Sequence, residues 1–82
     1  MTLYFYMREN CPLCEEAEQL LEMLQLDYHF TIEKRNIEED DRWLSQYQME
    51  IPVVEIGEDV LYGKDLNLHQ LEKKIKSLGY KS

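Results

Sequence analysis

The sequence predicts one domain that is an α/β sandwich, in which helices pack on the faces of a single β-sheet. Strand-like and helical patterns of apolar residues alternate along the chain in the order strand, helix, strand, helix, two-strand hairpin, helix. The chain has 82 residues, of which 44% are hydrophobic, and this suffices for one modest core. No repeat, low-complexity segment or linker interrupts the sequence, so residues 1–82 are expected to form a single domain.

The first half of the chain predicts two strands that flank a helix. Residues 2–7 (TLYFYM) are apolar on both faces, as in a buried central strand. Residues 12 to about 26 follow helical spacing, and residues 28–34 (YHFTIEK) are rich in strand formers. The expected buried stripe of this helix consists of Ala17, Leu20, Leu21 and Leu24.

The second half begins with a further helix and a hairpin. Asn36 followed by Glu39 resembles a capping box, so a helix is expected from there to about Tyr47. Residues 51–56 and 60–62 have the composition of two strands joined by a tight turn. We therefore expect them to pair as an antiparallel hairpin.

The last helix has two candidate N-caps, Asp65 and Asn67, either of which can accept a hydrogen bond from the first turn. Gly79 is expected to end this helix because glycine readily adopts the left-handed conformation found there. The expected buried stripe consists of Leu68, Leu71, Ile75 and Leu78.

Charge and hydropathy limit the classes of partner and the cellular location that we expect for this protein. The chain carries 9 basic and 17 acidic residues, a formal net charge of −8, which argues against nucleic acid or an anionic membrane as the main partner. No apolar run is long enough to span a bilayer, and the N-terminus lacks the basic and cleavage regions of a signal peptide. We therefore expect a cytoplasmic location. We also expect the protein to be a monomer. In that reducing compartment, two close cysteines indicate redox or metal chemistry rather than a structural disulfide.

Both cysteines lie at the start of the first predicted helix, in the stretch NCPLC. With Cys11 at the N-cap, Pro12 occupies the first helical position, where its missing N–H costs nothing. The Cys11 sulfur can then accept hydrogen bonds from the N–H groups of Leu13 and Cys14, and the helix dipole favours its thiolate. Cys11 is thus the expected nucleophile. Cys14, one turn deeper, is placed to resolve a mixed disulfide.

Two other roles for the cysteine pair have weaker support in the sequence. A zinc site needs two further ligands, and His29 and His69 lack the short spacing of a metal motif. Cysteines that only fill the core would not explain the proline or the helix-start position. No metal site is predicted.

Three segments resemble one family. The stretch YMRENCPLC combines a strand-ending tyrosine, a basic residue three before the first cysteine, and Cys-Pro-x-Cys. Ile51-Pro52 stands where a Val-Pro pair is expected, and Gly63 and Asp65 stand in a Gly-Gly-x-Asp segment. Across essentially the whole chain, this pattern resembles the glutaredoxin family of the thioredoxin fold. The resemblance implies a four-stranded mixed sheet in the order β-α-β-α-β-β-α.

The resemblance also implies roles for individual residues. Cys11 and Cys14 would be the catalytic pair of a small oxidoreductase that reduces protein or low-molecular-weight disulfides without a bound cofactor. Ile51 would pair its backbone with the substrate chain beside a cis-proline, Pro52. Arg8 would hold a substrate carboxylate and favour the Cys11 thiolate. The remaining residues implied to bind substrate are Gly63 and Asp65.

Several positions depart from the family pattern. Tyr62 replaces the first glycine of the Gly-Gly pair, and Glu50 replaces the threonine before Val-Pro. Gln48 and Met49 supply no cation where basic residues are common. Glu15 and Glu16 directly follow the second cysteine. These changes make glutathione, an anion, a doubtful reductant and point to another thiol reductant or a reductase, while the dithiol mechanism stays intact.

Two other functions remain open on this fold. One is a non-catalytic binding module that uses the pair as a redox sensor. The other is a glutathione-ligated iron–sulfur carrier using Cys11, which is disfavoured because an internal disulfide with Cys14 competes with cluster ligation.

Overall fold

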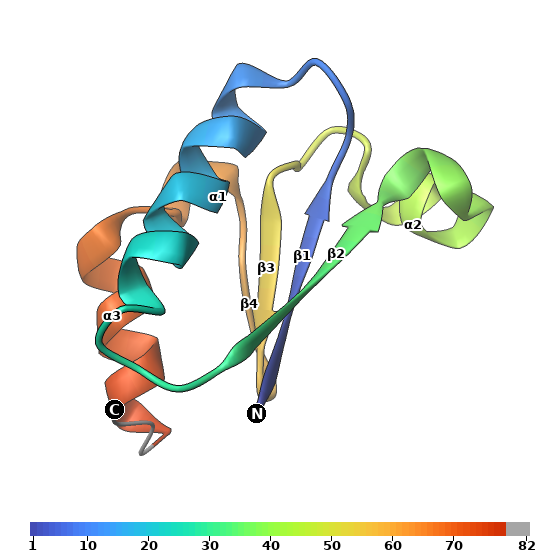
Figure 1. Cartoon of the computed structure of the whole chain (residues 1–82). Helices are drawn as coiled ribbons and strands as arrows, with labels where there is room; N and C mark the ends of the chain where they lie inside the picture. The colour runs from blue at the N-terminus through green and yellow to red at the C-terminus, as the bar shows by residue number, and fades with distance from the viewer. Residues whose placement is uncertain (79–82) are drawn as a thin grey trace.

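A four-stranded sheet with strand order β2-β1-β3-β4 forms the centre of the computed structural model, which describes residues 1–78 (Figure 1). β1 pairs in parallel with β2 and antiparallel with β3, and β3 pairs antiparallel with β4. The predicted order of elements and the mixed sheet are confirmed. The strands and helices are β1 (Thr2–Met7), α1 (Pro12–Leu24), β2 (Thr31–Asn36), α2 (Asp41–Tyr47), β3 (Val53–Ile56), β4 (Asp59–Leu61) and α3 (Leu68–Ser77).

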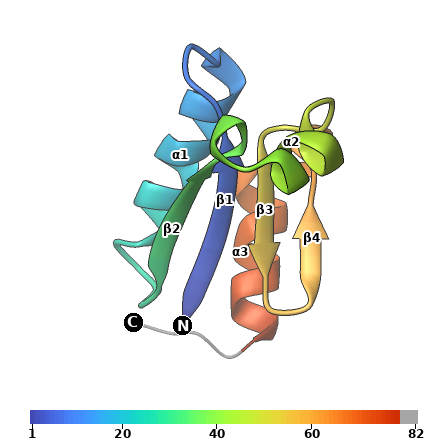
Figure 2. The same ribbon diagram turned by 90° about the vertical axis from the view of Figure 1, so that its right-hand side faces the viewer.

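The main core lies between the sheet and helices α1 and α3, which cover the same face (Figures 1 and 2). The sheet supplies alternate residues to this core because successive side chains of a strand point to opposite faces. Most of the expected stripe of α1 is buried, and Leu20 packs at its margin. The buried members of this core are Leu3, Phe5, Cys14, Ala17, Leu21, Leu24, Phe30, Val54, Ile56, Leu71 and Ile75.

The opposite face of the sheet carries the short helix α2 (Figure 2). A second, smaller cluster of buried residues forms there, and Trp43 and Leu44 of α2 pack against it. Trp43 is half-buried, as a helix residue that contacts the sheet with one edge would be. The buried members of this cluster are Tyr6, Ile37, Tyr47 and Val53.

The predicted second strand is shifted along the chain. It was expected at 28–34 but runs from Thr31 to Asn36. α1 closes with hydrogen bonds from the N–H groups of Asp27 and Tyr28 to the carbonyl oxygen of Leu24, so the chain is still turning at residue 28. The parallel register with β1 then sets both ends of the strand, since each of the six β1 residues has a partner in β2.

The helix predicted from Asn36 is two separate pieces. Asn36 caps a single 3-10 turn, η1 (Ile37–Glu39), by accepting the N–H of Glu38 at 2.9 Å. Asp40 then adopts an extended conformation and caps α2 by accepting the N–H of Arg42 at 2.8 Å. The capping box was therefore a wrong indication of one continuous helix: the side chain of Asp40 competes for the backbone amides and starts a new one.

Of the two candidate caps of the last helix, Asn67 is used, and it accepts the N–H of Gln70 at 2.9 Å. The buried stripe is narrower than expected, because Leu68 and Leu78 at the two ends of the helix are exposed. Gly79 lies outside the described residues. Within residues 1–78, no helix has the length and apolar character required to cross a membrane.

Candidate active site

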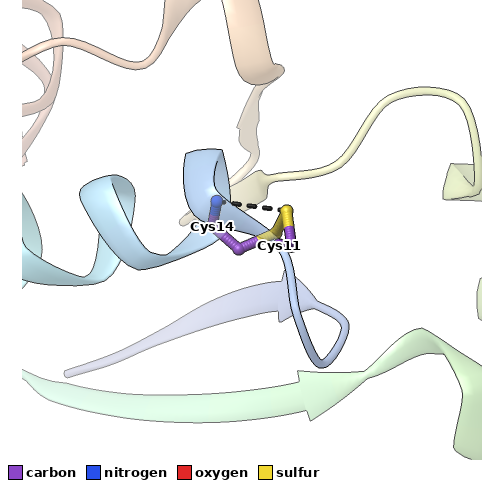
Figure 3. Close-up of a disulfide and its surroundings, with 2 residues drawn as sticks. All are labelled: Cys11 and Cys14. Carbon is purple, nitrogen blue, oxygen red and sulfur yellow. Dashed lines mark hydrogen bonds between the residues drawn. A yellow bond between two sulfur atoms is a disulfide. The ribbon is translucent and has the colours of Figure 1, made fainter.

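Cys11 occupies the N-cap of α1, as the sequence predicts. The chain leaves β1 and turns at Asn10, whose φ of 56° lies in the left-handed region that asparagine tolerates. Cys11 is extended, Pro12 begins the helix, and the N–H of Cys14 donates to the Cys11 sulfur at 3.2 Å (Figure 3). Of the two amide donors expected at this sulfur, the structure shows that of Cys14.

The two sulfurs are joined in a disulfide, with the Cα atoms 5.2 Å apart (Figure 3). Their exposure differs. The side chain of Cys14 is 2% exposed and belongs to the main core, whereas Cys11 is half-buried at the surface. Solvent and a substrate therefore reach Cys11 first, which is the asymmetry that an attacking and a resolving thiol require.

A polar depression borders the disulfide on the side of β1 and β2. Both cysteines line it, together with Arg8 and Lys34. Lys34 forms an ion pair of 3.0 Å with Glu18, which lies one turn beyond Cys14 on α1. The other residues that line the polar depression are Phe5, Met7, Glu9, Asn10, Glu15 and Glu18.

A second hollow, the apolar groove, lies beside Leu13 and Ile51. It brings together the start of α1, the turn after α2 and the segment before α3, which are distant in sequence. The residues that line it are Leu13, Met49, Glu50, Ile51, Tyr62, Gly63 and Lys64. The disulfide therefore lines the polar depression, and the apolar groove adjoins the same motif through Leu13, which lies between the two cysteines in the sequence.

The loop before β3 is held tightly at the end of α2. The Ile51–Pro52 peptide bond is cis, as the family resemblance implied. The carbonyl oxygen of Tyr47 accepts the N–H groups of Glu50 at 2.8 Å and Ile51 at 3.1 Å. The N–H of Gly63 in turn donates to the carbonyl of Glu50 at 3.3 Å. The N–H of Ile51 is therefore engaged within the molecule, which leaves its carbonyl oxygen as the backbone group that it can offer to a partner.

Tyr47 also connects this loop to a polar network on the α2 face. Its hydroxyl donates to the carboxylate of Glu55 at 3.3 Å, and the hydroxyl of Tyr6 donates to the same oxygen at 2.8 Å. Arg35 donates to the hydroxyl of Tyr6 at 2.9 Å. Burial, followed by the negative charge of Glu55, raises the pKa of Tyr47 to about 12. Burial and the hydrogen bond to Glu55 also raise the pKa of Tyr6.

The residues implied to bind substrate are divided between these surroundings. Arg8 lines the polar depression, whereas Ile51 and Gly63 line the apolar groove. Pro52 is buried behind the groove. Asp65 is exposed on the turn η2 (Gly63–Asp65), where its N–H donates to the carbonyl of Tyr62 at 2.7 Å, and it lines neither hollow.

Among the residues that line the hollows, sequence reasoning did not single out the side chains of Lys34, Leu13 and Lys64. Lys34 reaches the polar depression from β2, and Leu13 and Lys64 line the apolar groove. Leu13 and Lys64 each directly adjoin a motif residue, Cys14 and Gly63 respectively, and that adjacency was the available signal. Nothing in the sequence around Lys34 pointed to the dithiol, because its position depends on the parallel pairing of β1 and β2.

Comparison with known proteins places this arrangement in a family. The family model described as "Glutaredoxin-like domain (DUF836)" matches residues 2–76. The chain belongs to this glutaredoxin-like family. The match runs from the first residue of β1 to one residue before the end of α3, and the Cys11–Cys14 pair supports a redox-type module on this fold.

Two solved structures share the fold at low sequence identity. One is an X-ray structure of the structural genomics target protein XcR50 from X. campestris, with a TM-score of 0.74 and 22% identity over 92% of this chain and 96% of that one. The other is described as a malarial protein, with a TM-score of 0.66 and 12% identity over 93% of each chain. At these identities the likeness concerns the fold alone.

Proposed function

We propose that this glutaredoxin-like chain is a thiol–disulfide oxidoreductase that reduces protein or small-molecule disulfides through Cys11 and Cys14. The observation that carries the proposal is the difference between the two sulfurs. Cys11 is half-buried at the N-cap of α1 and accepts the Cys14 N–H at 3.2 Å, whereas Cys14 is 2% exposed. A helix N-terminus stabilises a thiolate, so the accessible sulfur of the reduced protein is the one that the fold favours as an anion.

The reaction proceeds in two exchanges. The Cys11 thiolate attacks one sulfur of a substrate disulfide, the substrate S–S bond breaks, and the departing substrate thiolate takes up a proton. Cys14 then loses its proton to solvent and attacks the Cys11 sulfur of the mixed disulfide, which releases the second substrate thiol. The substrate gains two electrons and the pair is left as the Cys11–Cys14 disulfide. An external dithiol or a reductase returns the two electrons, and no bound cofactor is required.

Charged residues around the pair influence how readily Cys11 forms the thiolate that attacks in the first exchange. Arg8 shares the polar depression with Cys11, and its positive charge favours the thiolate. Glu15 lines the same depression and opposes that effect. Arg8 is also the cation in this hollow best placed at the surface for a substrate carboxylate, because Lys34 is paired with Glu18.

We further propose that glutathione is a poor reductant for this chain. Tyr62 lines the groove where the family pattern has a glycine, and Glu50 adds a negative charge there. Lys64 offsets that charge without creating the excess of cations that a ligand with two carboxylates needs. The protein is proposed to act as a monomer in the cytoplasm, without nucleic acid or membrane as a partner, where a thiol reductant keeps the pair reduced.

Exchange of each cysteine for serine tests the division of labour. Cys11→Ser should abolish reduction of every disulfide substrate, because the attacking sulfur is absent. Cys14→Ser should abolish turnover on protein disulfides while retaining a mixed disulfide with substrate, which non-reducing electrophoresis and mass spectrometry detect. In the reduced wild-type protein, iodoacetamide should alkylate Cys11 before Cys14, and Arg8→Gln should slow that reaction.

Two results would contradict the proposal. Faster alkylation of Cys14 than of Cys11 would reverse the assigned roles. Formation of the Cys11–Cys14 disulfide at one equivalent of substrate, with no turnover in the presence of a dithiol reductant, would instead identify a redox-sensing module.

A further inference from the structure

The apolar groove presents three large apolar side chains to solvent. Leu13 is 63% exposed, Met49 is 88% exposed and Tyr62 is 37% exposed. They come from the start of α1, the turn after α2 and the residue before η2, yet all three line the same groove. Single exposed apolar residues are ordinary on a protein surface, but three that converge from separate segments, one of them between the two cysteines in the sequence, indicate a contact surface.

The charges of the groove do not favour an acidic ligand. Its two charged residues, Glu50 and Lys64, have opposite signs, so their formal charges cancel. The chain as a whole carries a net charge of −8, which repels anions as they approach. The groove therefore suits an apolar segment without acidic residues near the point of contact.

The backbone of the groove provides less than a full strand-pairing edge. Pairing of a substrate segment by strand addition uses both the N–H and the carbonyl of a residue on the receiving chain. The N–H of Ile51 already donates to the carbonyl of Tyr47 at 3.1 Å, and Pro52 has none to donate. A substrate segment can bond the Ile51 carbonyl, but the rest of its binding energy has to come from side-chain contacts.

We propose that the apolar groove selects extended protein segments in which a bulky apolar, non-acidic residue adjoins the cysteine attacked by Cys11. That residue packs against Leu13, Met49 and Tyr62. Met49 suits this role because its unbranched, flexible side chain can fit different apolar partners. The inference rests on the proposed disulfide reductase function and adds the class of segment that this chain prefers.

Synthetic peptides closed by a single disulfide test the preference. Three peptides that differ only in the residue next to one cysteine, which is leucine, alanine or aspartate, are mixed with excess reduced protein, and chromatography follows their reduction. The leucine peptide should react about fivefold faster than the alanine peptide, because a larger side chain buries more apolar surface in the groove. The aspartate peptide should be slowest. Equal rates for all three would overturn the inference.

Matched methionine and leucine variants assign the preference to the groove. Met49→Ala and Leu13→Ala should lower the leucine-to-alanine rate ratio towards one. Met23→Ala and Leu26→Ala change residues that are also exposed, 48% and 81% respectively, but line neither hollow, so the ratio should stay at its wild-type value. The ratio is insensitive to a general loss of folded protein. A wild-type ratio in both groove variants would overturn the inference.

The experiment separates this inference from the function on which it rests. If all peptides are reduced at one common rate, the selectivity is wrong while the reductase function stands. If neither the peptides nor a small aliphatic disulfide is reduced, both are wrong. If the groove instead binds a second copy of the chain, sedimentation should reveal a dimer that dissociates in the Met49→Asp variant. That result would likewise overturn the inference.

Discussion

The two faces of the sheet are built with different chemistry. Beneath α1 and α3, the β1 residues Leu3 and Phe5 are fully buried among aliphatic side chains. On the α2 face, the neighbouring residue Tyr6 contacts Arg35 and Glu55 through hydrogen bonds. One strand thus supplies an apolar core to one side and a polar, aromatic network to the other, since alternate side chains point in opposite directions.

The two faces therefore contribute differently to the protein. The apolar face stabilises the domain through the surface that it removes from water. The α2 face contributes directional contacts: the Arg35 guanidinium lies 4.1 Å from the ring centroid of Tyr4 and 5.1 Å from that of Trp43. That face also holds Tyr47, whose carbonyl fixes Ile51 beside the groove. Stability is therefore concentrated on one face, and the position of the cis-proline loop depends on the other.

The largest effect should come from the apolar face. Leu21→Ala removes a side chain that is 0% exposed and should lower the free energy of unfolding by about 3 kcal/mol, because it leaves a cavity in the core. Urea denaturation measures the change. Met23→Ala on the same helix, at a residue 48% exposed, is the control and should change stability by less than about 0.5 kcal/mol. Similar losses in the two variants would remove the distinction between the faces of α1.

A smaller effect is expected on the α2 face. Arg35→Met keeps the length of the side chain but removes the hydrogen bond to Tyr6 and the charge over the rings of Tyr4 and Trp43. The free energy of unfolding should fall by about 1–2 kcal/mol. Arg42→Met is the matched control, since this side chain is 86% exposed and pairs with Asp40 at the surface, and it should have no measurable effect. If the control loses as much free energy of unfolding as Arg35→Met, the network around Arg35 contributes no more to stability than a surface ion pair.

The effect that is smallest at neutral pH comes from the titration of Tyr47, which affects stability only at alkaline pH. Burial raises the pKa of Tyr47 to about 12 in the native protein, whereas in the unfolded chain this pKa has its ordinary value of 10.0. Because the native state binds more protons between these values, stability is fully present below pH 10.0 and is lost as the pH rises towards 12. Urea denaturation at pH values across this window should show a steeper loss for the wild type than for Tyr47→Phe. Equal slopes would contradict the assignment of this titration to Tyr47.

Local chemistry was enough to predict much of this structure. The Cys11 cap, the start of α1 at Pro12 and the order of elements all depend on residues close together in the sequence. The limits of β2 were wrong because they depend on pairing with β1, more than 20 residues upstream. The break at Asp40 was missed because the capping pattern at Asn36 does not show that a second side chain, that of Asp40, also accepts a backbone N–H and begins a new helix.

The candidate site likewise has features that the sequence predicts and features that depend on the three-dimensional structure. The cysteines were found from their spacing and the neighbouring proline. The engagement of the Ile51 N–H was not found, because it depends on how the turn after α2 closes onto Tyr47. The convergence of Leu13 with Tyr62 in one groove likewise depends on packing between segments about 50 residues apart, which no local pattern records.

The strand order leaves β2 and β4 as the edges of the sheet, and this bears on self-association. An open edge can recruit the same edge of another molecule and begin aggregation. β2 presents Glu33, Lys34 and Arg35 in succession, and β4 is 3 residues long. Charges of both signs on one edge and brevity on the other make each a poor template for a growing intermolecular sheet.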